Sequence, residues 1–197
     1  MGEKMNEFLR STAIFDWQHP DVFAQAKALA DGLSRPTEIV HACFTWVRDH
    51  ISHTHDAGLH TVTCTASEVL LAGTGLCYAK SHLLAALLRA NGIPVGLCYQ
   101  RLTYDDDRSR FCLHGLNAVS LPDIGWFRLD ARGNKPGVDA QFTPPVERLA
   151  FPITYAGERD LPGIWPNPLP EIVSVLTRNT RLEEVWEQLP DNFCETV

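Results

Sequence analysis

The N-terminal half of the chain carries apolar residues at helical spacing. The segment from Asp21 to Gly32 is rich in helix formers and ends in glycine, which predicts a helix. A second helix is predicted to open at Pro36, because proline suits the first turn of a helix. Its apolar positions follow one helix face: Ile39, Val40, Cys43, Phe44 and Val47.

An apolar run from Leu83 to Leu88 predicts a further helix with clear ends. A glycine turn, residues 73–75, precedes it, and Asn91-Gly92-Ile93-Pro94 follows it. Upstream, residues 65–68 form a Thr-x-x-Glu capping box, which predicts a short helix leading into the glycine turn. The long helix therefore begins next to Cys77, which lies in its first turn.

Strand patterns follow this helix. Pro94 to Leu102 is predicted as a strand, and so are Phe111 to Val119 and Trp126 to Leu129. A Pro/Asp/Gly turn at residues 121–125 joins the last two into an antiparallel hairpin. The charged residues 105–108 are interpreted as a solvated hairpin turn rather than a metal site. Helices followed by an antiparallel sheet predict the α+β class.

The C-terminal third has a different character, because prolines recur from Pro136 onward. We expect it to wrap the core in extended form, with a free linker as the alternative. Residues 171–188 are predicted to form one or two closing helices. The expected anchors are Phe151, Trp165 and Leu169 in the wrap and Val173, Leu176, Leu182 and Trp186 in the closing helices. We interpret the chain as one domain: an N-terminal helical segment (1–35), a core (36–135), and a proline-rich wrap with closing helices (136–197).

Composition excludes several classes of protein. The chain has 197 residues and a formal net charge of −7, which argues against nonspecific nucleic-acid binding. No run approaches the ~18 consecutive apolar residues that suggest a membrane-spanning helix. The first residues, Met1 to Arg10, lack the apolar core of a signal peptide, so a cytoplasmic location is expected. No cofactor motif is present, and none is expected to be needed.

The six cysteines are expected to be reduced thiols. Three of them, Cys43, Cys64 and Cys98, lie within apolar runs, as buried thiols do. No Cys-x-x-Cys pair occurs, so neither a zinc ribbon nor a thioredoxin-like site is predicted.

Cys77 is the strongest candidate for chemistry. The N–H groups of a first helical turn are unpaired and the helix dipole is positive there, so both favour a thiolate. The competing interpretation is an ordinary core cysteine. His114 on one strand and Asp130 at the end of the next complete a Cys–His–Asp set, in which an imidazole shuttles the proton and a carboxylate orients it. Taken alone, a histidine or an aspartate in such a place is more often structural. The order of Cys77, His114 and Asp130 along the chain strengthens the case that both are catalytic.

These residues carry a resemblance to a known family. The matching segments are Gly75 to Lys80, the helix end at Ala85 to Pro94, His114, Trp126, and Leu129-Asp130. With them the chain, over about residues 36–135, resembles the transglutaminase-like superfamily of cysteine enzymes, relatives of the papain architecture. The resemblance implies Cys77 as nucleophile, His114 as general base and acid, and Asp130 as the orienting carboxylate. It also implies a core that packs the helix of Cys77 on an antiparallel sheet.

A histidine cluster lies just upstream: His50, His53, His55 and His60, together with Asp56. Its spacing could suit a metal, but histidines at a helix end also pair with the last carbonyls. In the resembling fold this helix end borders the cleft. Our hypothesis is that His53 or Asp56 lines the cleft and helps to bind the acyl oxygen beside the backbone N–H of Cys77, with no metal involved.

The expected function is thiol-dependent acyl transfer on amide or peptide bonds through a thioester, with hydrolysis favoured over transamidation. An N-acetyltransferase and a non-catalytic peptide- or protein-binding module are the alternatives. The substrate is expected to be a peptide or protein amide. Four further polar residues could face either the cleft or the solvent, and the surface is expected for each: Arg101, Tyr104, Arg132 and Lys135.

Overall fold

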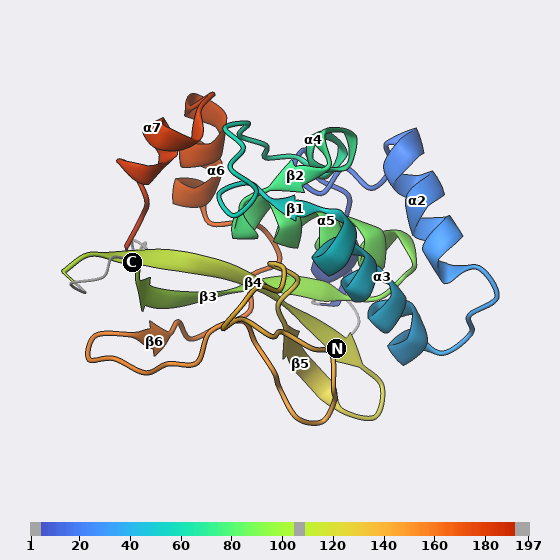
Figure 1. The fold of residues 1–197 in the computed structure, drawn as a ribbon. Coiled ribbons are helices and arrows are strands. Elements are labelled where there is room, and N and C mark those ends of the chain that lie inside the picture. The colour runs from blue at the N-terminus through green and yellow to red at the C-terminus, as the bar shows by residue number, and fades with distance from the viewer. Residues whose placement is uncertain (1–4, 105–108, 192–197) are drawn as a thin grey trace.

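A computed structural model describes residues 5–104 and 109–191 of the protein. Most of its helices gather on one side of a curled antiparallel sheet (Figure 1), so the predicted α+β class is confirmed. No helix in these two ranges has both the length and the apolar character needed to cross a membrane.

The N-terminal helices begin and end where local signals predict. A short 3-10 helix, η1 (Glu7–Leu9), precedes α2 (Pro20–Ala30) and α3 (Pro36–His50), and both α-helices carry proline at their start. In α4 (Ala66–Ala72) both hydrogen bonds of the predicted capping box form, and Gly73 ends the helix at a φ of 64°. That left-handed conformation favours glycine, which explains the residue found there.

The main sheet has the strand order β5-β4-β3-β6. β3 (Val95–Thr103) pairs antiparallel with β4 (Phe111–Leu121), and β4 pairs with β5 (Gly125–Leu129). β6 (Arg159–Asp160) joins the other edge of β3. These bounds confirm the three predicted strands to within a few residues; the predicted turn at 105–108 lies outside the described residues. β5 ends opposite Asn117, so the first half of β4 extends beyond it.

A second, two-stranded sheet was not predicted. β1 (Ser52–His53) runs parallel to β2 (Thr74–Gly75), with His53 opposite Gly75. Strands this short have no recognisable period in the sequence. They fasten the end of α3 to the segment that immediately precedes α5 (Cys77–Ala90).

The centre of the molecule is α5, in which every residue after Cys77 is buried. Charged side chains on this helix are therefore buried too. Arg89 donates to the carbonyls of Arg10, Val95 and Pro166 at 2.6–2.9 Å and lies over the ring of Phe15. A buried guanidinium is tolerated because its donors are satisfied in this way.

The C-terminal third wraps the core as expected. Trp165 exchanges two backbone hydrogen bonds with Leu97, and Leu169 is buried. The closing region, predicted over residues 171–188 as one or two helices, forms two: α6 (Pro170–Arg178) and α7 (Leu182–Trp186). Their expected anchors also contact the core: Leu176 and Leu182 are buried, and Val173 and Trp186 are partly buried against it.

Candidate active site

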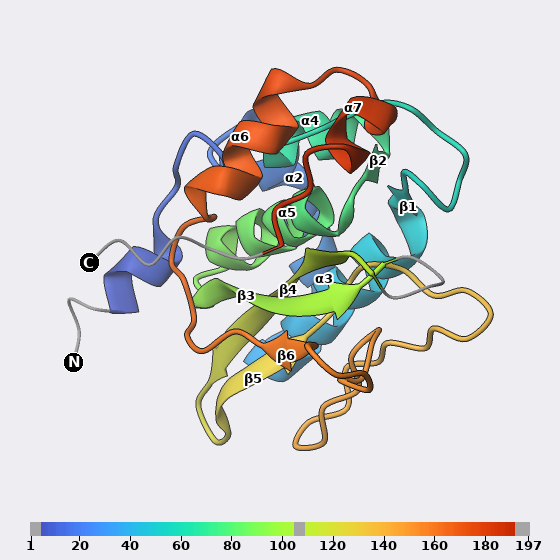
Figure 2. The same ribbon diagram turned by 90° about the vertical axis from the view of Figure 1, so that its left-hand side faces the viewer.

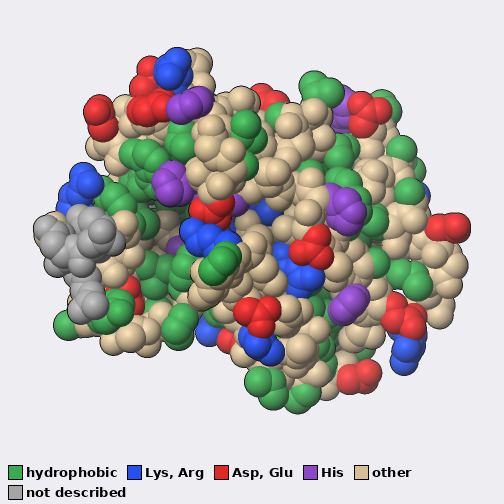
Figure 3. Space-filling model, viewed as in Figure 1, with side chains coloured by type: hydrophobic (Ala, Val, Ile, Leu, Met, Phe, Trp, Pro, Cys, Tyr) green, Lys and Arg blue, Asp and Glu red, His purple; other side chains and the backbone are tan. Residues whose placement is uncertain are grey.

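A cleft of about 520 Å³ opens where the beginning of α5 faces the first half of β4. Its polar lining includes Cys77, His114, His53, His55, Arg132 and Lys135, and its apolar lining includes Leu76, Leu102, Phe151, Trp186 and Leu189. Figure 3 shows histidine, basic and acidic side chains close together in the middle of this face. A cavity of about 610 Å³ between α2 and α4 holds none of the predicted site residues.

Cys77 is the first residue of α5, as predicted. The turn before it is tight: a Cβ on Gly75 would stand 3.1 Å from both the Ala79 Cβ and the Thr63 Oγ1, so a side chain there would force its neighbours to shift. Cys77 is half-buried and lines the cleft. By contrast Cys43, Cys64 and Cys98 are buried free thiols, and burial raises the pKa of each to about 12.

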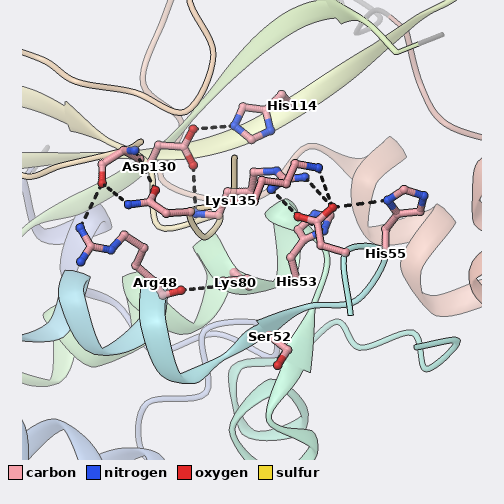
Figure 4. Close-up of polar contacts among 12 residues, drawn as sticks. Arg48, Ser52, His53, His55, Lys80, His114, Asp130 and Lys135 are labelled. Atoms are coloured by element: carbon pink, nitrogen blue, oxygen red, sulfur yellow. Dashed lines mark hydrogen bonds and ion pairs between the residues drawn. The ribbon is translucent and has the colours of Figure 1, made fainter. Parts of the chain in front are cut away.

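His114 stands between Cys77 and Asp130. Its Nε2 lies 2.7 Å from Asp130 Oδ2, and its side chain faces that of Cys77 closely enough for Cys77 to raise the pKa of His114. Asp130 follows the last residue of β5 and is fully buried. Figure 4 shows its carboxylate pointing at the imidazole. The structure therefore brings together the three residues that the sequence singled out.

The charges of this set reinforce one another. Burial alone would lower the pKa of His114, but the negative charges of Asp130 and Cys77 outweigh it and raise that pKa to about 10. Burial alone would raise the pKa of Asp130, but His114 and two backbone N–H groups hold it below its usual range. Imidazolium and carboxylate are thus the favoured forms at neutral pH.

The proline-rich wrap completes this part of the site, which sequence reasoning missed. The Ala150 N–H donates to Asp130 Oδ2 at 3.2 Å, and the ring of Phe151 meets the imidazole of His114 edge-on. Phe151 was expected only as an anchor for the core. Nothing in its local sequence signals the contact with His114, because 36 intervening residues separate the two segments.

Asp56 lies in a cluster of charges with Arg132 and Lys135. It accepts two hydrogen bonds from the guanidinium of Arg132, at 2.6 and 3.2 Å, and one from Lys135 at 2.8 Å. Burial alone would raise its pKa, but these two cations hold the pKa well below its usual range. Its carboxylate is therefore committed to Arg132 and Lys135.

His53 lines the cleft near Asp56. Its Nδ1 lies 3.6 Å from Asp56 Oδ2, is buried, and makes no hydrogen bond within the described part of the chain. Burial, and then the charge of Arg132, lower the pKa of His53 to about 3, so the ring is neutral. The β1–β2 pairing places His53 opposite Gly75, two positions before Cys77.

Arg132 was expected at the surface rather than in the cleft. That expectation was wrong, because the residue lines the cleft and is only 7% exposed. Its backbone N–H donates to Asp130 Oδ1 at 3.1 Å while its guanidinium holds Asp56. Tyr104 and Lys135 also line the cleft. The surface expectation failed because residues just past Asp130 turn back toward the core to reach Asp56.

Lys80, at the end of the matching segment Gly75 to Lys80, is fully buried, and the sequence predicted no role for it. Its Nζ donates to the carbonyls of Ile51 and Arg48, beside the start of β1. Burial, and then the charge of Arg132, lower its pKa to about 7. The available signal was a lysine one turn into a helix whose centre is the apolar run Leu83 to Leu88.

The histidines of the cluster do not point at a common site. His50 stacks on Trp46, His60 pairs with Glu183, and His55 faces both Asp56 and Trp186. Across residues 5–104 and 109–191, no group of three or more His, Cys, Asp or Glu side chains is arranged to hold a metal ion.

Comparison with known proteins was made on both sequence and fold. Residues 24–131 match the family described as the transglutaminase-like superfamily. No curated protein matches the sequence closely enough to count as a relative. Among solved structures, a proposed cysteine protease from Cytophaga hutchinsonii superposes with a TM-score of 0.55 at 16% identity, over 67% of this chain and 43% of that one.

Two more structures resemble parts of the chain. A proposed protease from Parabacteroides distasonis has a TM-score of 0.44 at 18% identity, over 65% of this chain and 25% of its own. The periplasmic domain of TgpA from Pseudomonas aeruginosa has a TM-score of 0.43 at 19% identity, over 57% of this chain and 42% of its own. The chain therefore spans less than half the length of each protein.

Proposed function

Because the chain belongs to the transglutaminase-like superfamily, we propose that it is a thiol-dependent acyl-transfer enzyme acting on amide or peptide bonds. One observation carries the proposal: Cys77 and His114 line the same cleft and interact electrostatically, and the His114 imidazole is hydrogen bonded to the buried Asp130 carboxylate. A nucleophile, a proton carrier and an orienting group in this order are what acyl transfer by a thiol needs.

The first half-reaction cleaves the amide. The Cys77 sulfur attacks the carbonyl carbon, a C–S bond forms, and the carbonyl electron pair moves to oxygen. The His114 imidazolium gives its proton to the amide nitrogen, and the C–N bond breaks with its electron pair leaving on the amine. A thioester on Cys77 remains and His114 is neutral. The pKa of about 10 for His114 supports a protonated starting state at neutral pH.

The second half-reaction releases the acyl group. As a water oxygen attacks the thioester carbon, His114 takes a proton from that water, and the C–S bond then breaks to return the thiolate. A primary amine in place of water would give transamidation. Hydrolysis is favoured here because two cations, Arg132 and Lys135, line the cleft, and their positive charge disfavours the entry of a protonated amine.

The oxyanion formed in each step needs donors. The backbone N–H of Cys77 lies in the first turn of α5, where such groups have no partner within the helix. We assign His53 as the second donor, through Nε2–H, because it lines the cleft and its neutral ring makes no hydrogen bond at Nδ1, within the described residues, that would hold the proton there. Asp56 does not touch the oxyanion in this proposal; it positions His53 and Arg132 through its charge.

The test compares wild-type protein with Cys77→Ala on a proteome-derived peptide library. New amino termini, read by mass spectrometry, report hydrolysis, and incorporation of monodansylcadaverine, a fluorescent primary amine, reports transamidation. We expect new termini from the wild type alone. If both proteins give the same products in both assays, acyl transfer on amides is wrong.

Two other functions remain as outcomes of further measurements. An N-acetyltransferase would form an acetyl thioester on Cys77 from a small acetyl donor, visible as a mass increase of the intact protein. A non-catalytic binding module would show no selective reaction of Cys77. In an enzyme, iodoacetamide should label Cys77 well before the buried Cys43, Cys64 and Cys98.

A further inference from the structure

We propose that the cleft recognises a peptide through the backbone N–H of Leu113 and through an adjoining apolar seat, the part of the cleft lined by Trp186 and Tyr104. We further propose that the chain's own segment Leu189-Pro190-Asp191 occupies this binding site. The inference rests on the proposed function, because it names the substrate class of the same site. It concerns binding, however, and can be tested without turnover.

The first observation is a backbone contact beside the triad. The Leu113 N–H, one residue before His114 in β4, donates to the Pro190 carbonyl at 2.7 Å. β5 has already ended at this point, since its last pair is Leu129 with Asn117. The Leu113 carbonyl is taken by the Tyr78 hydroxyl. Pro190 therefore supplies to this edge the group that any peptide carries, a main-chain carbonyl.

The second observation is the apolar seat. Leu189 lines the cleft and is partly buried against the core. The rings of Trp186 and Tyr104 stack beside it, 6.3 Å apart and 8° from parallel, so α7 and the end of β3 meet across the mouth of the cleft. Figure 2 shows the segment after α7 running down toward β3 and β4. An apolar side chain fits this place when the next residue of the peptide directs its carbonyl at the Leu113 N–H, as Pro190 does after Leu189.

The third observation is that the segment is held weakly. Apart from the Leu113 hydrogen bond and the partial burial of Leu189, its polar contacts within the described residues are those of Arg101, whose Nε donates to the Asp191 carbonyl at 3.0 Å and whose Nη2 lies 3.5 Å from Asp191 Oδ2. The Asp191 side chain is 59% exposed, and exposed pairs of this kind contribute little. A peptide can therefore displace the segment, as main-chain capture with one side-chain seat allows.

Self-occupation has a measurable consequence. A tethered occupant competes at an effective concentration in the range of about millimolar, and the apparent affinity for a free peptide falls by the fraction of molecules left open. If about nine molecules in ten are occupied, removing the segment should tighten peptide binding about tenfold.

The experiment measures binding in a Cys77→Ala background, so that no peptide is consumed. The probe is a fluorescein-labelled peptide copying residues 186–191, Trp-Glu-Gln-Leu-Pro-Asp, followed by fluorescence anisotropy. We expect it to bind a chain ending at Gln188 at least about tenfold more tightly than the full chain. A probe with glutamate in place of its leucine should not bind. Leu71→Glu, on an 89% exposed leucine of α4, is the matched control for substitution at Leu189.

Each outcome decides. Equal affinity of the probe for the shortened and the full chain overturns the inference. A shortened chain that folds but binds no probe also overturns it, because the segment then only covers the edge of β4. If the shortened chain does not fold, Leu189→Glu in the full chain takes its place and should bind the unmodified probe more tightly than Leu71→Glu does. Cys77-dependent cleavage without probe binding refutes this inference alone, whereas probe binding without cleavage by active protein refutes the proposed function alone.

Discussion

The ring of Phe151 meets the imidazole of His114 edge-on, with centroids 5.1 Å apart and planes at 85°. Phe151 also lies under the guanidinium of Arg132, 5.3 Å from its ring centroid. One residue earlier, the Ala150 N–H donates to Asp130. The wrap therefore does more than cover the core, because it contacts both the His114 imidazole and its partner, the Asp130 carboxylate, and so fixes their relative positions.

We predict that Phe151→Ala lowers kcat on peptide substrates by about ten- to a hundredfold, because the imidazole loses the surface that fixes its plane. The neighbouring Ile153→Ala, at a 40% exposed position, should leave kcat within twofold or so. Steady-state kinetics on both variants decide the matter, with thermal unfolding as the check on folding. Equal kcat values for the two variants would remove the positioning role of Phe151.

The triad should show an order of severity. Cys77→Ala and His114→Ala should fall near background, because one removes the nucleophile and the other removes proton delivery to the leaving amine. Asp130→Asn should be intermediate, about 10²–10⁴ below wild type, because the imidazole can then take the wrong tautomer. Iodoacetamide labelling of Cys77 against pH adds an independent measurement. Wild type should label at a steady rate through neutral pH, while His114→Ala should label only as an ordinary thiol ionises. An unchanged profile in His114→Ala would point to another partner, with His53 tested first.

His53→Ala should lower kcat by about 10²–10³, the usual loss for one oxyanion donor. KM should change little, because the interaction forms only as the oxyanion develops. His50→Ala, on a histidine stacked against Trp46 at the end of α3, is the control and should keep wild-type kinetics. Wild-type turnover in His53→Ala would leave the backbone N–H of Cys77 as the principal donor.

His114 and Lys80 should give opposite pH dependences of stability. The folded-state pKa of His114 is raised to about 10, so its stabilising contribution is complete below about pH 6.5 and is lost as pH rises through 10. The folded-state pKa of Lys80 is lowered to about 7, so the cost of burying its charge declines as pH rises from 7 toward its unfolded value. Each residue changes the free energy of unfolding by up to about 1.4 kcal/mol per pH unit, and the two changes have opposite signs.

Urea unfolding at pH 7 and pH 8 separates the two effects, in a range where most free thiols are still protonated. The free energy of unfolding of the wild type should be nearly the same at the two pH values, because the two effects offset each other. His114→Gln should be more stable at pH 8 than at pH 7 by roughly 1 kcal/mol, and Lys80→Met should be less stable at pH 8 by a similar amount. A flat response in both variants would mean that neither group has the shifted pKa described here.

Local sequence signals were sufficient for much of the fold. Proline at the start of α3, the capping box of α4 and the glycine turn before α5 are each encoded within a few residues, and each is formed as predicted. The order of Cys77, His114 and Asp130 along helix, strand and strand end also follows from such signals, because a hairpin brings consecutive strands together. These features depend on backbone conformation, which neighbouring residues largely determine.

The remaining parts of the site depended on segments far apart in the chain. Asp56 meets Arg132 across 76 positions, Ala150 reaches Asp130 from the wrap, and Pro190 reaches Leu113 from the C-terminal segment. No period or cap marks such pairs, since each residue's own neighbours look like ordinary loop. Only the packing of the wrap and α7 against the sheet decides which charges are paired, which histidine is neutral and which backbone group is covered, because burial and distance, not residue type, set those energies.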